Sequence, residues 1–225
     1  RKICLTGGFN PPDFSFHLTS TYVYDPAADR WTQAADMPEP RAAHGMAAIN
    51  GKLYLVGGDG LADPTEVWVY DPTTDTWNTS PAHLPSRRDH PAVAVLDDKL
   101  YVIGGRWRDQ GRYSTTEVYD VAADTWTRLA DMPVPRSAAT AGVLDGTIHV
   151  TGGEDMERFC TYDEHDVYDP TTDSWTRERN LPTTRHGMAS AVLDNRWYVI
   201  GGGISAGPYA HRTFTGALEI YLPAG

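Results

Sequence analysis

The sequence has few cysteines, few lysines and no long apolar segment. Its 225 residues include two cysteines, Cys4 and Cys160, which cannot form a framework of disulfides. No apolar run approaches the ~18 residues that a membrane-spanning helix requires. The sequence starts at Arg1 without a signal-like segment, so it leaves open whether a leader was removed, and it leaves the compartment unknown. The formal net charge of −11 argues against a nucleic-acid binder, because neutralising phosphates requires clustered cations.

Helical periodicity is absent as well, and short motifs recur instead at a nearly constant spacing. Five glycine pairs each follow a short apolar run, and their first members are separated by 50, 47, 48 and 49 residues. Between them recurs a Tyr-Asp pair whose tyrosine precedes a tryptophan by seven residues. An arginine lies 16 residues before each of the last four glycine pairs. These arginines are Arg41, Arg88, Arg136 and Arg185. Such self-similarity is the signature of a repeat architecture.

Each repeat predicts a four-stranded antiparallel sheet. Strand a is the run of small residues after the arginine, and strand b is the run into the glycine pair. The a–b links, such as Asn50-Gly51, contain the residues that tolerate positive φ in two-residue hairpins. Strand c carries the recurring tyrosine and strand d the tryptophan. Small residues place strand a innermost, the glycine pairs leave room for a large ring, and the recurring aromatics are expected to pack neighbouring sheets together.

The double glycine, tyrosine and tryptophan at this spacing resemble the kelch repeat, and the match covers residues 1–222. The resemblance implies an all-β fold, a kelch-type β-propeller, with residues 1–225 as a single domain. The expected repeats lie at about 1–37, 41–84, 88–132, 136–181 and 185–222.

The first repeat lacks strand a and the last lacks strand d, so 18 strands are expected in five blades. We expect these blades to be part of a six-bladed ring. A seven-bladed ring, a five-bladed ring in which the incomplete sheets abut, and a partner chain that fills the gap are the alternatives.

The links between strands b and c are long and unlike one another, and they emerge on the same face as the d–a links. Variable loops on a rigid scaffold are where binding sites usually lie. Several loop aromatics can instead fold back over the base of their own loop. The residues predicted to bind a ligand on this face are Arg41, Arg88, His90, Arg106, Trp107, Tyr113, Arg136, Phe159, Arg185, Tyr209 and His211.

The recurring arginines admit two interpretations. Their presence in every complete repeat favours a structural role, in which they donate hydrogen bonds to loop carbonyls or to a neighbouring blade. A ring of guanidinium groups that binds a carboxylate or sulfate is the functional alternative. Peptide-binding kelch proteins hold acidic peptides with arginines near strand a, but residues 43, 90, 138 and 187 here do not reproduce such a clamp.

No catalytic motif breaks the repeat. The acidic residues of 154–166 are interpreted as a solvated charged loop. The histidines lie at different offsets from the arginines, which makes a shared metal site improbable, and no cofactor is predicted. The predicted function is a non-enzymatic binding or scaffold propeller, whose partner is a protein, a peptide or a carbohydrate. The alternative is a carbohydrate-active enzyme, of the sugar epimerase or lyase type, with a site at the same face.

Overall fold

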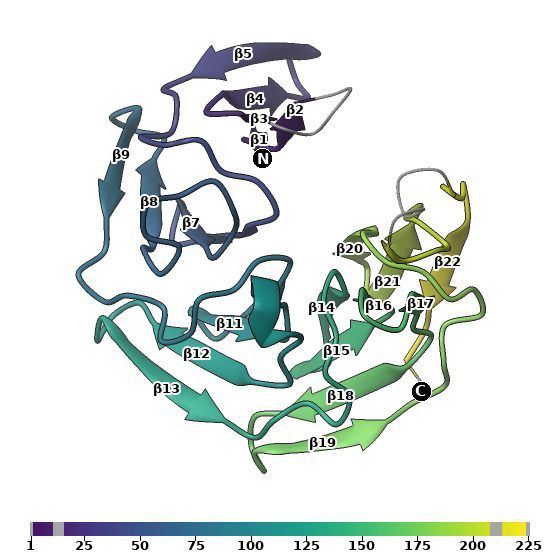
Figure 1. Ribbon diagram of the computed structural model, residues 1–225. Coiled ribbons are helices and arrows are strands. Elements are labelled where there is room, and N and C mark those ends of the chain that lie inside the picture. The colour runs from purple at the N-terminus through teal and green to yellow at the C-terminus, as the bar shows by residue number, and fades with distance from the viewer. Residues whose placement is uncertain (1, 11–15, 208–212, 224–225) are drawn as a thin grey trace. The chain divides into compact units, whose positions relative to one another are not determined.

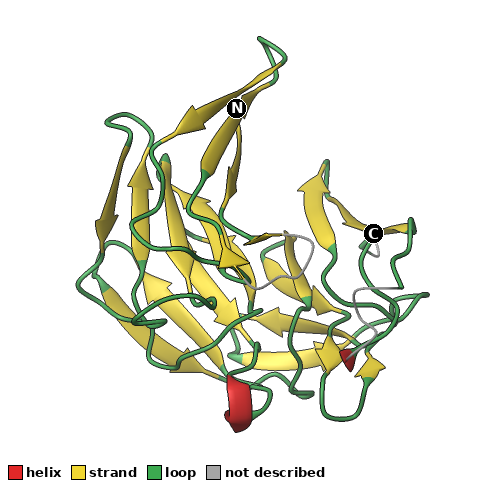
Figure 2. Cartoon of the chain, turned by 45° about the horizontal axis from the view of Figure 1, so that its top comes forward, coloured by secondary structure: helices red, strands yellow, loops and turns green. Residues whose placement is uncertain are grey.

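The structure, a computed structural model of the chain, describes residues 2–10, 16–207 and 213–223. The chain divides into two compact units, 1–89 and 90–225. The described residues form β-strands with only short 3₁₀ turns such as η1 (Arg108–Gln110), so the all-β prediction is confirmed (Figures 1 and 2). Within the described ranges, no helix has the length and apolar character needed to cross a membrane.

The first unit contains two blades. Its first blade is a three-stranded sheet of strands b, c and d, in the order β1 (Ile3–Thr6), β4 (Thr21–Asp25) and β5 (Arg30–Ala34). A hairpin in its b–c link consists of β2 (Phe9–Asn10) and β3 (Phe16–His17). The second blade is complete, with β6 (Gly45–Ile49), β7 (Lys52–Val56), β8 (Trp68–Asp71) and β9 (Thr76–Thr79).

The second unit contains three blades. The third blade consists of β10 (Ala92–Leu96), β11 (Lys99–Ile103), β12 (Thr116–Asp120) and β13 (Thr125–Leu129). The fourth consists of β14 (Thr140–Leu144), β15 (Thr147–Thr151), β18 (His165–Asp169) and β19 (Ser174–Arg177), with a hairpin of β16 (Glu154–Asp155) and β17 (Cys160–Thr161) in its b–c link. The fifth has β20 (Ala189–Leu193), β21 (Arg196–Ile200) and β22 (Leu218–Tyr221).

The described strands of these five sheets match the predicted 18, with strand a missing from the first sheet and strand d from the last. The single-domain extent and the number of blades in a complete ring stay predictions.

The a–b hairpins turn through the residues that the sequence predicts. Asn50 and Gly51 have φ values of 50° and 77°, and Asp97 and Asp98 have values of 52° and 57°. Two consecutive residues with positive φ make the turn whose twist matches that of the flanking strands. This geometry holds Leu96 opposite Lys99 and keeps strands a and b in register.

The glycine pairs have a different role from the expected one. Gly152 has a φ of 66°, and a Cβ added to it would lie 2.6 Å from the carbonyl oxygen of Arg185. The second glycine, Gly153, donates its N–H to that same oxygen at 2.9 Å. The pair therefore brings strand b against the backbone of the next arginine segment. The large ring packs elsewhere: a Cβ at Gly142 on strand a would lie 2.6 Å from Nε1 of Trp197.

The small residues of strand a are explained by the packing of the second unit. Each of its a strands lies against the a strand of the next blade, so that β10 contacts β14 and β14 contacts β20. Because successive a strands lie this close, large side chains at every position would not fit between them. The innermost position predicted for strand a therefore agrees with the structure of this unit.

Tyrosine, aspartate and tryptophan join one blade to the blade before it. In the fourth blade, the Nε1 of Trp175 donates to the Ala130 carbonyl at 2.9 Å, and the Ala130 N–H donates to Oδ1 of Asp173 at 2.8 Å. The Tyr168 hydroxyl donates to the same Asp173 oxygen at 2.7 Å. Asp169, in contrast, caps its own turn by accepting the Thr171 N–H at 2.8 Å.

Candidate functional site

The four recurring arginines lie inside their blades, and each is 0% exposed. Arg136 donates to Oδ2 of Asp166 at 2.7 Å and to the Val150 carbonyl at 3.2 Å. Arg185 repeats this arrangement with Oε2 of Glu219 at 2.6 Å and the Val199 carbonyl at 3.2 Å. These contacts attach the d–a segment to strands b and c of its own blade.

In the first unit, Arg41 donates to the Glu66 carbonyl at 3.1 Å, and its guanidinium carbon lies 4.0 Å from the centre of the Trp68 ring. Burial lowers the pKa of Arg41 to about 9, although Glu66 and Glu39 oppose this shift. Arg88 donates from its Nε to the Ser86 carbonyl at 3.4 Å. Ligand binding by the four arginines stays a prediction, and their contacts support the structural interpretation.

The residue two positions after each arginine has a left-handed backbone. His90, Ala138 and Gly187 have φ values of 51°, 53° and 62°. The Ala138 N–H donates to the His90 carbonyl at 2.9 Å, and the Gly187 N–H donates to the Ala138 carbonyl at 2.8 Å. A string of backbone hydrogen bonds thus links consecutive blades of the second unit. The predicted site residue His90 is half-buried at the start of this string.

Two buried carboxylates and two arginines form an ionic network on the b–c loops of the second unit. Glu154 and Asp155 follow a glycine pair in strand β16 and are 2% and 0% exposed. Arg106 donates to Oε1 of Glu154 at 2.5 Å, and Arg112 lies 2.5 Å from Oδ2 of Asp155. The interpretation of this acidic stretch as a solvated loop is therefore wrong for these two residues, because each is enclosed with a cationic partner. It is also wrong for Asp166, which is 0% exposed on strand β18 and accepts from Arg136.

Side chains from neighbouring segments complete this network. Nδ1 of His186 lies 3.5 Å from Oε2 of Glu154. Arg112 also donates to the Tyr162 hydroxyl at 2.8 Å. Burial raises the pKa of Tyr162, Arg112 opposes the shift and Asp155 adds to it. We call Arg106, Arg112, Glu154, Asp155, Tyr162 and His186 the ionic network.

The aromatic residues predicted to bind a ligand differ in their surroundings. Trp107 is 7% exposed, and the guanidinium carbon of Arg108 lies 4.8 Å from its ring centre. Tyr113 donates from its hydroxyl to Oε1 of Gln110 at 2.8 Å, within its own loop. Phe159 is 61% exposed in the turn between β16 and β17. Phe159 is therefore the solvent-facing aromatic among these three.

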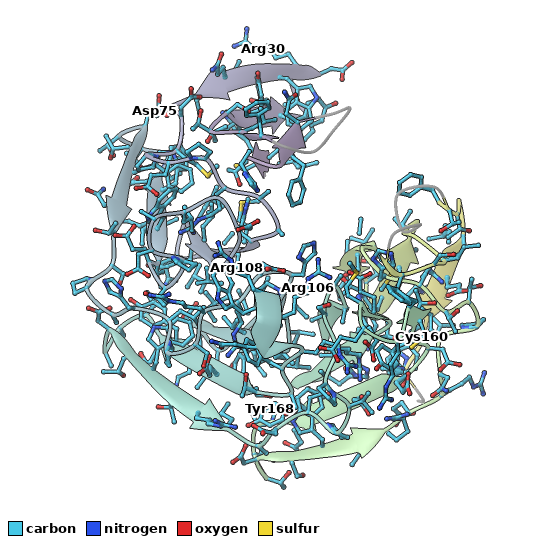
Figure 3. All side chains as sticks on the ribbon, in the orientation of Figure 1. Arg30, Asp75, Arg106, Arg108, Cys160 and Tyr168 are labelled. Carbon is cyan, nitrogen blue, oxygen red and sulfur yellow. The ribbon has the colours of Figure 1, made fainter. Side chains whose placement is uncertain are left out.

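The remaining predicted residues have separate outcomes. Tyr209 and His211 lie outside the described residues. Arg106 belongs to the b–c link of the third blade (Figure 3), and its side chain is 21% exposed beside Glu154.

The sequence prediction missed the other five members of the ionic network. A signal was available, since Glu154 and Arg106 are charged residues that directly follow glycine pairs.

The ionic network can hold polar groups of a ligand but shows no metal centre. Across residues 2–10, 16–207 and 213–223, no cluster of three histidine, cysteine, aspartate or glutamate side chains is placed to hold a metal ion. Arg106 and Arg112 are 21% and 15% exposed, so part of each guanidinium faces solvent. Guanidinium groups that are held in place and partly exposed suit carboxylates and carbonyl oxygens.

Repeated four-stranded sheets, a strands that lie side by side within the second unit, and variable b–c loops define a propeller-type repeat protein. A family model described as the KLHDC2/KLHL20/DRC7 Kelch-repeats domain matches residues 59–215, and a Kelch motif model matches residues 2–38. The chain belongs to the kelch-repeat family, so the prediction of a kelch-type β-propeller with five blades represented is confirmed.

Curated relatives support the same family. The chain is 31% identical over 172 residues to Kelch-like protein terF of Aspergillus terreus, which covers 69% of this chain and 37% of that protein. It is 34% identical over 157 residues to mouse Kelch-like protein 35, covering 68% of this chain and 25% of that protein. Beta-scruin of Limulus polyphemus is 30% identical over 163 residues, covering 67% of this chain and 18% of that protein. The chain thus spans well under half the length of these relatives.

A solved structure, that of YjhT, shares the fold. Its TM-score with this chain is 0.81 at 16% sequence identity, and the match covers 98% of this chain and 78% of YjhT. Identity at this level speaks to the fold alone.

Proposed function

We propose that this chain is a non-enzymatic binding or scaffold propeller that recognises a protein or peptide through its b–c and d–a loops. The ionic network carries this proposal. Each buried carboxylate in it already contacts an arginine, at 2.5 Å for both Glu154 and Asp155. Both oxygens of Asp155 are engaged, Oδ2 by Arg112 and Oδ1 by backbone N–H groups of its own turn, so a substrate proton would have to displace one of these partners before Asp155 acted as a general base. A charge-balanced, rigid surface favours recognition instead.

Exposed groups beside the ionic network supply anchors for a partner. Phe159 is 61% exposed at the tip of the β16–β17 hairpin. Arg106 and Arg112 retain partly accessible guanidinium groups whose positions are held by the buried carboxylates. Aromatic residues and arginine are the side chains that most often dominate binding energy at interfaces. An apolar or aromatic side chain next to an acidic one is the chemistry that we expect in the partner.

The test is a peptide array and a glycan array probed with the chain, followed by affinity measurement on each hit. We expect peptide hits whose affinity falls about tenfold or more in Phe159→Ala and in Arg112→Gln. Arg30→Gln, on strand β5, is the matched control because Arg30 is an exposed arginine outside these loops. Peptides that bind all variants equally would show that the partner does not bind at the b–c and d–a loops. Hits confined to the glycan array would show that the partner is a carbohydrate and not a protein or peptide.

One contact favours a carbohydrate-active enzyme of the epimerase or lyase type as a second candidate. Oε2 of Glu154 is buried and accepts no hydrogen bond from the described residues, and Nδ1 of His186 lies 3.5 Å from it. A carboxylate and an imidazole so placed can exchange a proton with a sugar hydroxyl or carbon acid. Incubation of any glycan hit, with products followed by NMR and mass spectrometry, tests this role. Turnover that disappears in His186→Gln would establish the enzyme, and unchanged glycans would exclude it.

A further inference from the structure

The ionic network contains one carboxylate oxygen that lacks a donor. Arg106 donates to Oε1 of Glu154 at 2.5 Å, whereas Oε2 accepts no hydrogen bond from the described residues. The glutamate is enclosed, with 3% of its side chain exposed, and Nδ1 of His186 lies 3.5 Å from Oε2. A buried acceptor without a partner costs free energy, and the cost is larger for a charged group. The contact between Glu154 and His186 therefore needs an explanation.

The other ring nitrogen of His186 determines what Nδ1 presents to the glutamate. Nε2 lies 3.0 Å from the Ser205 carbonyl oxygen, which can only accept, so Nε2 must carry a hydrogen. A neutral imidazole has a single N–H, and its Nδ1 is then left with a lone pair. In that state two acceptors face each other at 3.5 Å. A proton on Nδ1 would turn the same contact into a charge-assisted hydrogen bond.

The charged side chains around His186 have partners of their own. Its neighbour Arg185 is fully buried and donates to Oε2 of Glu219 at 2.6 Å. Arg136, in the d–a segment of the fourth blade, donates to Oδ2 of Asp166 at 2.7 Å. The described part of the fifth b–c link contains no ionisable side chain. The ionic network supplies the other charged or titratable groups, which are Arg106, Arg112, Glu154, Asp155 and Tyr162. Its two guanidinium groups are balanced by its two carboxylates, so a proton on His186 supplies the donor that Oε2 lacks.

His186 connects the fifth b–c link to the fourth. Its backbone exchanges two hydrogen bonds with Gly203 of the fifth link, each at 2.9 Å. Glu154 begins the β16–β17 hairpin of the fourth link, and the ring of Phe159 in this hairpin lies against Gly207 of the fifth link. A bond between His186 and Glu154 therefore fastens together the two links on which the exposed Phe159 depends for its position.

We propose that His186 is a positioning residue whose protonated imidazole closes the fifth b–c link against the β16–β17 hairpin by donating to Oε2 of Glu154. Imidazole is the side chain that changes charge between pH 5 and 8. The closed arrangement favours the protonated ring, so closure strengthens as the pH falls and weakens as the pH rises. Tighter partner binding at acidic pH is the consequence for the loop face, and this consequence rests on the proposed function.

Closure is measured by hydrogen–deuterium exchange at pH 8 and pH 5.5, followed by NMR and corrected for intrinsic exchange rates. The N–H groups of Gly203 and Ile204 donate to backbone carbonyls at 2.9 and 2.8 Å, so their exchange reports opening of the fifth link. We expect their protection, divided by that in His186→Gln, to rise about tenfold from pH 8 to pH 5.5, the value of a hydrogen bond to a charged group. Effects of pH that do not involve His186 are common to both proteins and cancel in this ratio.

Two further variants separate the proton from the packing. His83→Gln is the matched control, because Nδ1 of His83 also lies 3.5 Å from a carboxylate oxygen, that of Asp63, but its side chain is 49% exposed. Protection of Gly203 in this variant should equal that of the unmodified chain at both pH values. Glu154→Gln should reverse the pH dependence, since its amide N–H can donate to the neutral Nδ1 while its carbonyl oxygen still accepts from Arg106.

Nitrogen-15 NMR of the histidine rings tests the protonation state directly. The His186 signals, assigned by their absence from His186→Gln, should show a hydrogen on Nε2 alone at pH 8 and on both nitrogens at pH 5.5. A ring whose Nε2 lacks a hydrogen at pH 8, or a protection ratio that does not change with pH, would overturn the proposal. These measurements contain no partner, so their failure is distinguishable from failure of the peptide and glycan arrays.

Discussion

A pair of buried histidines in the fourth blade predicts that this protein loses stability between pH 7 and pH 5. His149 and His165 are 5% and 3% exposed, and Nδ1 of His149 lies 2.9 Å from Nε2 of His165. Burial lowers the pKa of His149 from 6.5 to about 4, with a smaller contribution from His165. Burial also lowers the pKa of His165, although the Arg179 carbonyl opposes this shift.

The direction in which stability changes with pH follows from proton binding to the folded and unfolded chains. Between pH 4 and 6.5 the unfolded chain protonates His149 while the folded chain does not, so stability rises with pH across this window. For His149 alone, a pKa near 4 instead of 6.5 corresponds to a loss of about 2 kcal/mol between pH 7 and pH 5. Partial solvent access reduces this to about 1 to 2 kcal/mol. His165 adds a loss of the same sign.

The assay is urea unfolding at pH 7, 6 and 5, followed by tryptophan fluorescence. The informative variant is His149→Tyr, because tyrosine occupies the corresponding position of strand b in three other blades, at 54, 101 and 198. We expect this variant to show a smaller loss of stability at pH 5, and His149→Tyr with His165→Thr to show a smaller loss still. A pH dependence that is the same in all three proteins would refute the reasoning.

The repeat contacts yield two further predictions. Gly152→Ala should destabilise the protein by about 3 kcal/mol, because its Cβ would lie 2.6 Å from a backbone carbonyl at a φ of 66°. Gly146→Ala is the control, because Gly146 has a φ of 77° but no atom lies within 4 Å of an added Cβ. We expect it to lower the free energy of unfolding by about 1 kcal/mol in the same urea experiment. Equal losses in the two variants would show that the close approach of Gly152 to the Arg185 carbonyl is unimportant. Trp175→Phe should cost about 1 kcal/mol by removing the hydrogen bond to the Ala130 carbonyl. The 52% exposed Trp31 is its control, and thermal unfolding that shifts equally in Trp31→Phe would contradict the role given to the indole N–H.

The repeat motifs were sufficient to predict the blades, because each feature of a repeat acts locally. The a–b turns need residues that accept positive φ, and Asn50-Gly51 and Asp97-Asp98 supply them. Alternation and spacing then define which strands pair. The missing strands of the first and last sheets followed from the same count. Local interactions of this kind repeat with the sequence and are readable from it.

The candidate site was less predictable because its contacts join loops that share no pattern. Arg106 was predicted to bind a ligand, but its pairing with Glu154, 48 residues away, depends on how two b–c links fold against each other. Ligand binding by Trp107 stays a prediction, and its side chain is 7% exposed. The sequence showed charged and aromatic residues in these loops without showing which would be enclosed.

The sequence by itself determined the repeat, the strand order within each blade and the turn geometry, since these depend on neighbouring residues and on a period that recurs five times. Tertiary structure alone decided the burial of the recurring arginines and the enclosure of Glu154 and Asp155. These features arise where segments distant in the chain remove each other from water. The free energy of burying a charge or an indole depends on that packing and not on the residue's place in a repeat.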